Sequence, residues 1–248
     1  MNSTIAAWYH LNSIPIGIHP ESIDSGTIIW NRLPKSREKN TSGVRFRVLV
    51  LPLDFLDSMA WDVAAAAALL GVTMLKLPYK ASSGSVNAEG RNIRIGLAAA
   101  IGASGLYLFL TGIAISFIWP FGAISGGLYN VLFGGVAALG GLLLLAISVV
   151  LFLNSSLAPV SYFAVVVGIY AVVGAYAMVR YGLTKQPLVS ALGYLAFAVT
   201  AFLSVPATHS DNRWLRWLFA AFAFLFALAW VIQAAGFTLE HLQPPPPA

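Results

Sequence analysis

Long apolar stretches fill the chain from about residue 58 onward, and only short polar segments interrupt them. A helix that crosses the roughly 30 Å hydrocarbon core of a bilayer needs about 20 mainly apolar residues. The apolar residues run continuously and do not alternate with polar ones, so we expect helices and not the strands of a membrane barrel. Six spans are predicted, at about residues 58–75, 95–118, 131–153, 157–179, 188–205 and 214–239.

These spans define the expected fold class and domains. We predict an all-α, polytopic transmembrane bundle of about six helices at residues 51–240. A polar and basic, weakly ordered extension precedes it at residues 1–50, and a proline-rich tail follows at residues 241–248. Asp57 or Ser58 is expected to cap the first span, and Pro206 is expected to end the fifth. The first span is short and carries a carboxylate, so we expect it to be tilted or peripheral.

Composition agrees with a lipid-facing protein. Hydrophobic residues make up 58% of the chain and charged residues 9%, whereas soluble domains carry about 25% charged residues. The chain has no cysteine, which excludes disulfides, cysteine-ligated metals and thiol nucleophiles. We interpret the net charge of +5 as membrane-flanking charge and not as a nucleic-acid surface. The expected location is the cell membrane, with the lipid bilayer as the first partner.

The loops carry an uneven share of lysine and arginine. Residues 76–94 hold four basic side chains against one acidic, and two arginines follow the fifth span. Because short basic loops stay in the cytoplasm, this distribution predicts an N-terminus outside and a cytoplasmic first and fifth loop. Arg180, Lys185 and the basic N-terminal extension disagree, because they would then lie outside.

Residues for metal, haem or covalent chemistry are scarce. The four histidines, at positions 10, 19, 209 and 241, all lie outside the predicted spans, so paired intramembrane haem ligands are absent. No nucleophile, phosphate-binding or zinc-protease motif is found. We therefore predict no catalytic residue, no metal site and no cofactor.

Asp62 is the one acidic residue predicted inside a span. Ionisable groups within membranes are by default functional candidates, so Asp62 could bind a proton or a cation. The alternative, which we favour, is an interfacial first-turn residue stabilised by the positive end of the helix dipole.

The segment between the second and third spans, residues 119–135, has no charge and is rich in aromatic residues and glycine. Trp119 is expected to anchor at the interface, and Pro120 to stop the second helix. One hypothesis is a loop that folds back into the bilayer and offers Tyr129 and Asn130 to a ligand, with Gly134 allowing close packing. The other, which we favour, is a glycine-rich turn within an aromatic belt.

The same segment carries a family resemblance. A Trp-Pro turn followed by Tyr-Asn-x-Leu-Phe-Gly, at the start of a long span, resembles a family of archaeal and bacterial membrane proteins known as domain of unknown function 981. The resemblance covers roughly residues 58–239 and leaves about the first 50 residues unmatched. It implies a multi-span fold and no particular activity.

Three function classes remain open. We rank first a non-catalytic structural or accessory subunit that forms a homo-oligomer or joins other membrane subunits. A channel or carrier for a small neutral solute comes second; it would show a polar cavity reaching Tyr129 or Asn130. A membrane enzyme acting on lipid or quinone comes third. Small residues four apart, such as Gly134 with Ala138 and Ala137 with Gly141, fit a dimer interface, but we expect packing within one bundle.

Overall fold

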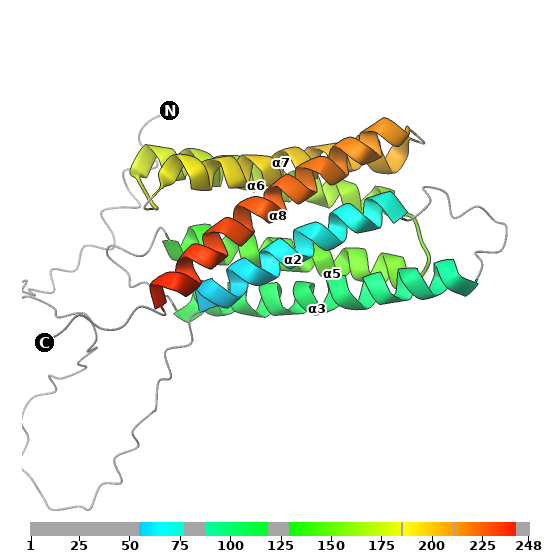
Figure 1. Cartoon of the computed structure of the whole chain (residues 1–248), viewed down its shortest axis with the longest axis horizontal. Coiled ribbons are helices and arrows are strands. Elements are labelled where there is room, and N and C mark those ends of the chain that lie inside the picture. Colours follow the sequence, from blue (N-terminus) through cyan, green and yellow to red (C-terminus); the bar gives the residue numbers. More distant parts are fainter. Residues whose placement is uncertain (1–54, 77–87, 119–128, 185, 211, 242–248) are drawn as a thin grey trace, which may run out of the picture. The chain divides into compact units, whose positions relative to one another are not determined.

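The computed structural model describes residues 55–76, 88–118, 129–184, 186–210 and 212–241, and these are almost entirely helical (Figure 1). The predicted all-α fold is confirmed. The loop residues Trp119 and Pro120, the N-terminal extension and the tail beyond residue 241 lie outside the described residues. The helices are α2 (Phe55–Lys76), α3 (Ala88–Ile118), α5 (Gly135–Phe152), α6 (Ala158–Tyr181), α7 (Pro187–His209) and α8 (Arg213–His241), with a π-helical turn, η1 (Asn130–Gly134), leading into α5.

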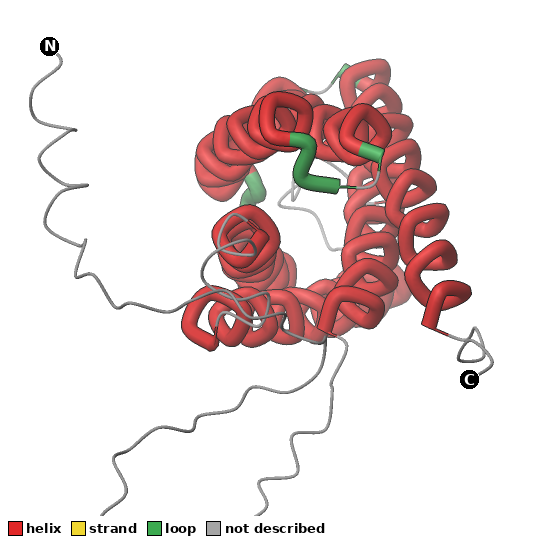
Figure 2. Tube along the Cα trace, turned by 90° about the vertical axis from the view of Figure 1, so that its left-hand side faces the viewer, coloured by secondary structure: helices red, strands yellow, loops and turns green. Residues whose placement is uncertain are grey.

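Six helices of the described chain are long and apolar enough to cross a membrane. They form a closed ring in chain order, seen end-on in Figure 2. The closest pairs are α3 with α5, α6 with α7, and α2 with α8; looser contacts of α2 with α3, α5 with α6 and α7 with α8 complete the ring. Because α8 returns to α2, the last helix closes the ring against the first.

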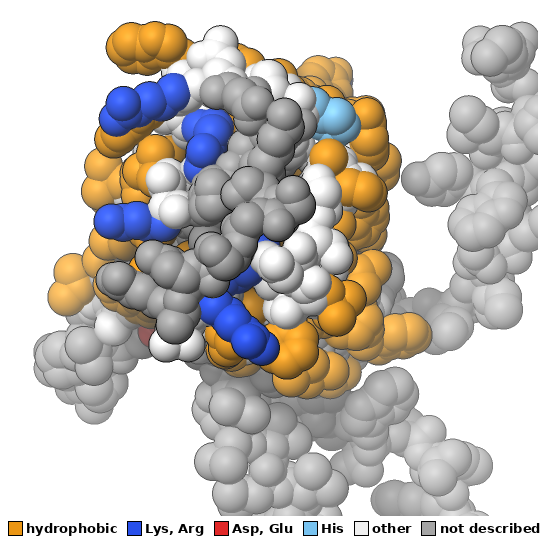
Figure 3. All heavy atoms as spheres, turned by 90° about the vertical axis from the view of Figure 1, so that its right-hand side faces the viewer, with side chains coloured by type: hydrophobic (Ala, Val, Ile, Leu, Met, Phe, Trp, Pro, Cys, Tyr) orange, Lys and Arg blue, Asp and Glu red, His pale blue; other side chains and the backbone are white. Residues whose placement is uncertain are grey.

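Successive helices run in opposite directions, so the ring has two distinct ends. At the end where α2 finishes and α8 begins, Arg216 donates hydrogen bonds to the carbonyl oxygen of Met74. At the other end, Thr238 near the end of α8 donates to Asp57 near the start of α2 at 2.6 Å. We call these the basic end and the Asp57 end. Figure 3 shows lysine and arginine side chains gathered at the basic end.

The first helix is not peripheral, so that half of the prediction is wrong, while its tilt in the membrane stays a prediction. On α2, Met59 is 2% exposed and Ala60 is 0% exposed. The helix contacts both α8 and α3, because its small inward residues let both neighbours approach. The run of alanines at residues 64–68 provides much of this close surface.

Two predicted helix ends are also wrong. α2 begins at Phe55, so Asp57 and Ser58 lie inside its first turn and do not precede it. α7 continues through Pro206 to His209. A proline near the end of a helix lacks the backbone N–H donor, but its carbonyl oxygen can still accept a hydrogen bond. Here Ser210 donates its backbone N–H to the Pro206 carbonyl oxygen at 3.2 Å.

Small residues bring α3 and α5 into backbone contact. A Cβ atom on Gly112 would lie 2.7 Å from the carbonyl oxygen of Gly134 and would collide with the backbone nitrogen of Ala138. Gly105 and Gly141 meet in the same way one heptad further along. These glycines thus let helices pack closely within one bundle, as expected. Self-association through such faces stays a prediction.

Candidate functional site

Of the residues singled out after the second span, Tyr129, Asn130 and Gly134 belong to a helix and not to a loop. Tyr129 is helical, and its ring stacks on that of Phe133 with 6.2 Å between centroids. Asn130 is 0% exposed and begins the π-helical turn η1. Such turns recur at functional sites. A ligand role for Tyr129 and Asn130 stays a prediction.

A neighbouring helix stabilises this π-helical turn. The Tyr170 hydroxyl on α6 donates to the Val131 carbonyl oxygen at 3.0 Å, and Gly135 provides the space, because a Cβ there would overlap the tyrosine oxygen. Gly134 faces α3, where a Cβ would lie 2.6 Å from the Ser116 hydroxyl oxygen. The role observed for Gly134 is therefore close helix packing.

Asp62 lies about two turns into α2, because that helix begins at Phe55. The first-turn position that we favoured for it is therefore wrong; Asp57 occupies the first turn instead. Ser104 on α3 donates to Oδ1 of Asp62 at 2.9 Å. Oδ2 is buried and has no hydrogen-bond partner among the described residues. One turn away, Ser58 and Tyr107 join the same two helices by a 2.5 Å hydrogen bond.

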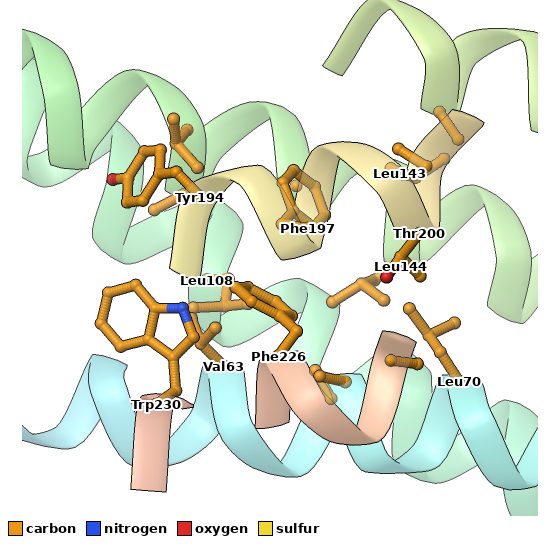
Figure 4. Close-up of a pocket in the computed structure, with 18 of the residues that line it drawn as sticks. Val63, Leu70, Leu108, Leu143, Leu144, Tyr194, Phe197, Thr200, Phe226 and Trp230 are labelled. Atoms are coloured by element: carbon orange, nitrogen blue, oxygen red, sulfur yellow. The ribbon is translucent and has the colours of Figure 1, made fainter. Parts of the chain in front are cut away.

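A cavity of about 120 Å³ lies inside the ring and is lined by all six helices. A single water molecule needs roughly 10–15 Å³, so there is room for about ten non-hydrogen atoms. The wall is almost wholly apolar (Figure 4), and Tyr129 and Asn130 are not part of it. This cavity is therefore not the polar cavity reaching Tyr129 or Asn130 that a carrier would show. Labelled wall residues in Figure 4 include Val63, Leu108, Leu144, Tyr194, Phe197 and Trp230.

A second, smaller cavity of about 50 Å³ continues the first toward the basic end. The two share wall residues such as Leu70, Leu143 and Ser204. Thr73 and Thr208 add hydroxyls to its wall, and both donate to backbone carbonyls of their own helices at 2.7 Å. From Tyr194 to Thr208 on α7, the two cavities together extend about 21 Å at the rise of an α-helix.

Sequence reasoning missed this cavity. The signal was present on α8, where Phe219, Ala223, Phe226 and Trp230 recur at helical spacing and all line it. In a span that is apolar on every face, an inward stripe has no polar counterpart that would mark it.

Hydrogen bonds of the basic side chains hold the basic end together. Arg94 is 7% exposed and donates to the side-chain oxygen of Asn154, which joins α3 to the connection after α5. Tyr162 and His209 lie 3.1 Å apart across α6 and α7. Within the described ranges, no group of three histidine, cysteine, aspartate or glutamate residues is placed to hold a metal ion.

The ring of six apolar helices defines a multi-pass α-helical membrane protein. The model of a family described as "Protein of unknown function (DUF981)" matches residues 52–244, so the chain belongs to this family, as its Trp-Pro and Tyr-Asn-x-Leu-Phe-Gly residues predicted. Comparisons with curated proteins and with solved structures gave no match.

Proposed function

We propose that this protein is a non-catalytic membrane protein that holds a small apolar molecule inside its helix ring. The observation that carries the proposal is the cavity, whose wall comes from all six helices and is almost entirely apolar. An apolar cavity of this size stays dry and binds small apolar molecules, because water would find no hydrogen-bond partners there. Filling it recovers the dispersion contacts that the facing side chains lack.

This proposal favours a binding role for a neutral molecule over a purely structural one. Of the cavity's wall residues, none is charged, so a path for ions through it would lack the polar groups that replace an ion's water. A role beside other membrane subunits is compatible with the same cavity and stays a prediction.

The proposal is tested by filling the cavity from its wall. Gly140 lines it, and a Cβ built there meets nothing within 4 Å, so Gly140→Leu places a side chain in the open space. The purified protein is incubated with decane that carries a photoactivatable diazirine, and labelled peptides are mapped by mass spectrometry. We expect wild-type labelling on cavity-lining peptides, and at least a tenfold loss in the variant.

The control is Gly96→Leu on α3, where the added side chain also meets nothing within 4 Å but lies outside the cavity wall. It should label like the wild type. Labelling confined to lipid-facing positions in the wild type, or equal labelling of the two variants, would show that the cavity holds no such molecule.

A further inference from the structure

The indole of Trp230 is a buried hydrogen-bond donor without an acceptor. The side chain is 6% exposed, and its Nε1–H has no hydrogen-bond partner among the described residues. A buried donor left unpaired is expensive, so such groups are rare in native structures and need a reason. By contrast, the indole of Trp61, on α2, donates to the Thr238 hydroxyl at 3.1 Å.

The unpaired nitrogen lies at the cavity. Trp230 is part of the cavity wall, and Figure 4 shows the nitrogen edge of the indole turned toward Leu108, Val63 and Phe226. The Phe226 ring meets the indole in a T-shaped arrangement with centroids 6.3 Å apart. An aromatic face is a much weaker acceptor than an oxygen, so this contact leaves the donor available.

Two other hydroxyl groups of the wall, both on α7, are already paired. Thr200 donates its hydroxyl to the Ala196 carbonyl oxygen at 2.8 Å, and Ser204 donates to Ala201 at 2.6 Å. These bonds stay within α7. Among the described residues, the Trp230 indole is thus a buried and unpaired donor of the wall that a bound molecule would satisfy.

We propose that the molecule held in the cavity carries a hydrogen-bond acceptor oxygen, such as a ketone, aldehyde or ester carbonyl, which binds Nε1–H of Trp230. Its hydrocarbon part extends from there past Phe197 toward Leu143 and Ser204. The size is about ten non-hydrogen atoms for the main cavity and a few more if the second cavity is used. This inference rests on the proposed function and adds the chemical class of the ligand.

The depth of Trp230 points to a free molecule and not to the ester group of a bilayer lipid. Trp230 lies about three helical turns, or roughly 16 Å, before the end of α8 at His241. Lipid ester groups lie at the membrane interface, outside the hydrocarbon core. A carbonyl that reaches Trp230 must therefore enter with its own hydrocarbon part.

The test compares 2-decanone with 2-methyldecane, in which a methyl group replaces the carbonyl oxygen. Each compound competes against the diazirine decane for labelling of the cavity. One added hydrogen bond predicts that 2-decanone competes about 3- to 10-fold better. Trp230→Phe, which keeps an aromatic ring and removes the donor, should abolish this difference. Trp217→Phe on the same helix, at a side chain 49% exposed and outside the cavity wall, should preserve it.

A second measurement detects binding in the wild-type protein and does not require any variant to bind a compound. In protein labelled with ¹⁵N at tryptophan, 2-decanone should shift the indole signal that Trp230→Phe removes, and 2-methyldecane should leave it in place. Equal competition by the two compounds, with an unmoved indole signal, would overturn this inference and leave the proposed function standing. Failure of both compounds to compete would overturn the proposed function itself.

Discussion

At the scale of single residues, two buried polar atoms in the described chain lack partners, Oδ2 of Asp62 and Nε1 of Trp230. Both belong to side chains on membrane-spanning helices, where water cannot satisfy them. Trp230 faces the cavity, whereas Asp62 lies on α2 toward α3 and outside the cavity wall. The two atoms therefore belong to different parts of the ring, and only one of them bears on what the cavity binds.

The hydrogen bond from Ser104 to Asp62 predicts a measurable coupling between α2 and α3. Replacing Ser104 by Ala removes the donor to Oδ1 and should destabilise the protein by about 0.6–1.7 kcal/mol, the range found for such bonds inside membranes. The same change in an Asp62→Ala background should cost close to nothing. Unfolding of the four proteins in mixed micelles measures this cycle, and equal costs in both backgrounds would mean that the bond contributes no stability.

At the scale of helices, the closest packing is that of α3 against α5. Lipid supplies no hydrophobic force between helices, so their association depends on close backbone approach and on bonds such as that from Ser148 to the Ala98 carbonyl oxygen, 2.6 Å long. Glycines at 105 and 112 on α3 and at 141 on α5 make the approach possible. Larger residues at these positions would force the two helices apart.

We expect Gly112→Ala to destabilise the bundle by about 1–3 kcal/mol or more, because the methyl group would meet backbone atoms that cannot move aside independently. Gly96→Ala is the matched control on the same helix, since a Cβ there meets nothing within 4 Å. Thermal denaturation in a mild detergent compares the two. A Gly112→Ala protein as stable as the control would show that α3 and α5 are packed more loosely.

At the scale of the whole ring, most of the described basic side chains lie at one of its two ends. Among the described residues, the basic end carries Lys76, Arg91, Arg94, Arg213 and Arg216. The Asp57 end carries Arg180 and Asp57. Under the rule that basic loops stay in the cytoplasm, we expect the basic end to face the cytoplasm.

The absence of cysteine makes this orientation directly testable with single cysteines. Asn212→Cys places an exposed thiol between α7 and α8 at the basic end, and Gln186→Cys places one between α6 and α7 at the Asp57 end. In intact cells, a membrane-impermeant maleimide should label position 186 and label position 212 only after the cells are opened. The reverse pattern would invert the proposed orientation.

The sequence was sufficient for the class of protein, the number of spans and most of their limits. A run such as residues 131–153 predicts a helix by itself, because lipid leaves a backbone no other partner for its hydrogen bonds. The family resemblance followed from a few residues near Tyr129. Local rules for helix ends failed at two places. Pro206 did not end α7, and Asp62 did not lie in the first turn of α2.

The sequence by itself thus determined that the described part of the chain has six helices apolar and long enough to cross a membrane, and where the basic residues lie, since hydropathy and charge are properties of local segments. Only the tertiary structure decided that the six helices close into a ring, that α2 is a full member of it, and that an apolar cavity with the Trp230 donor lies inside. The physical reason is that spans apolar on all sides carry no sign of which face turns inward. That choice comes from the fit of small residues on one helix against large ones on the next.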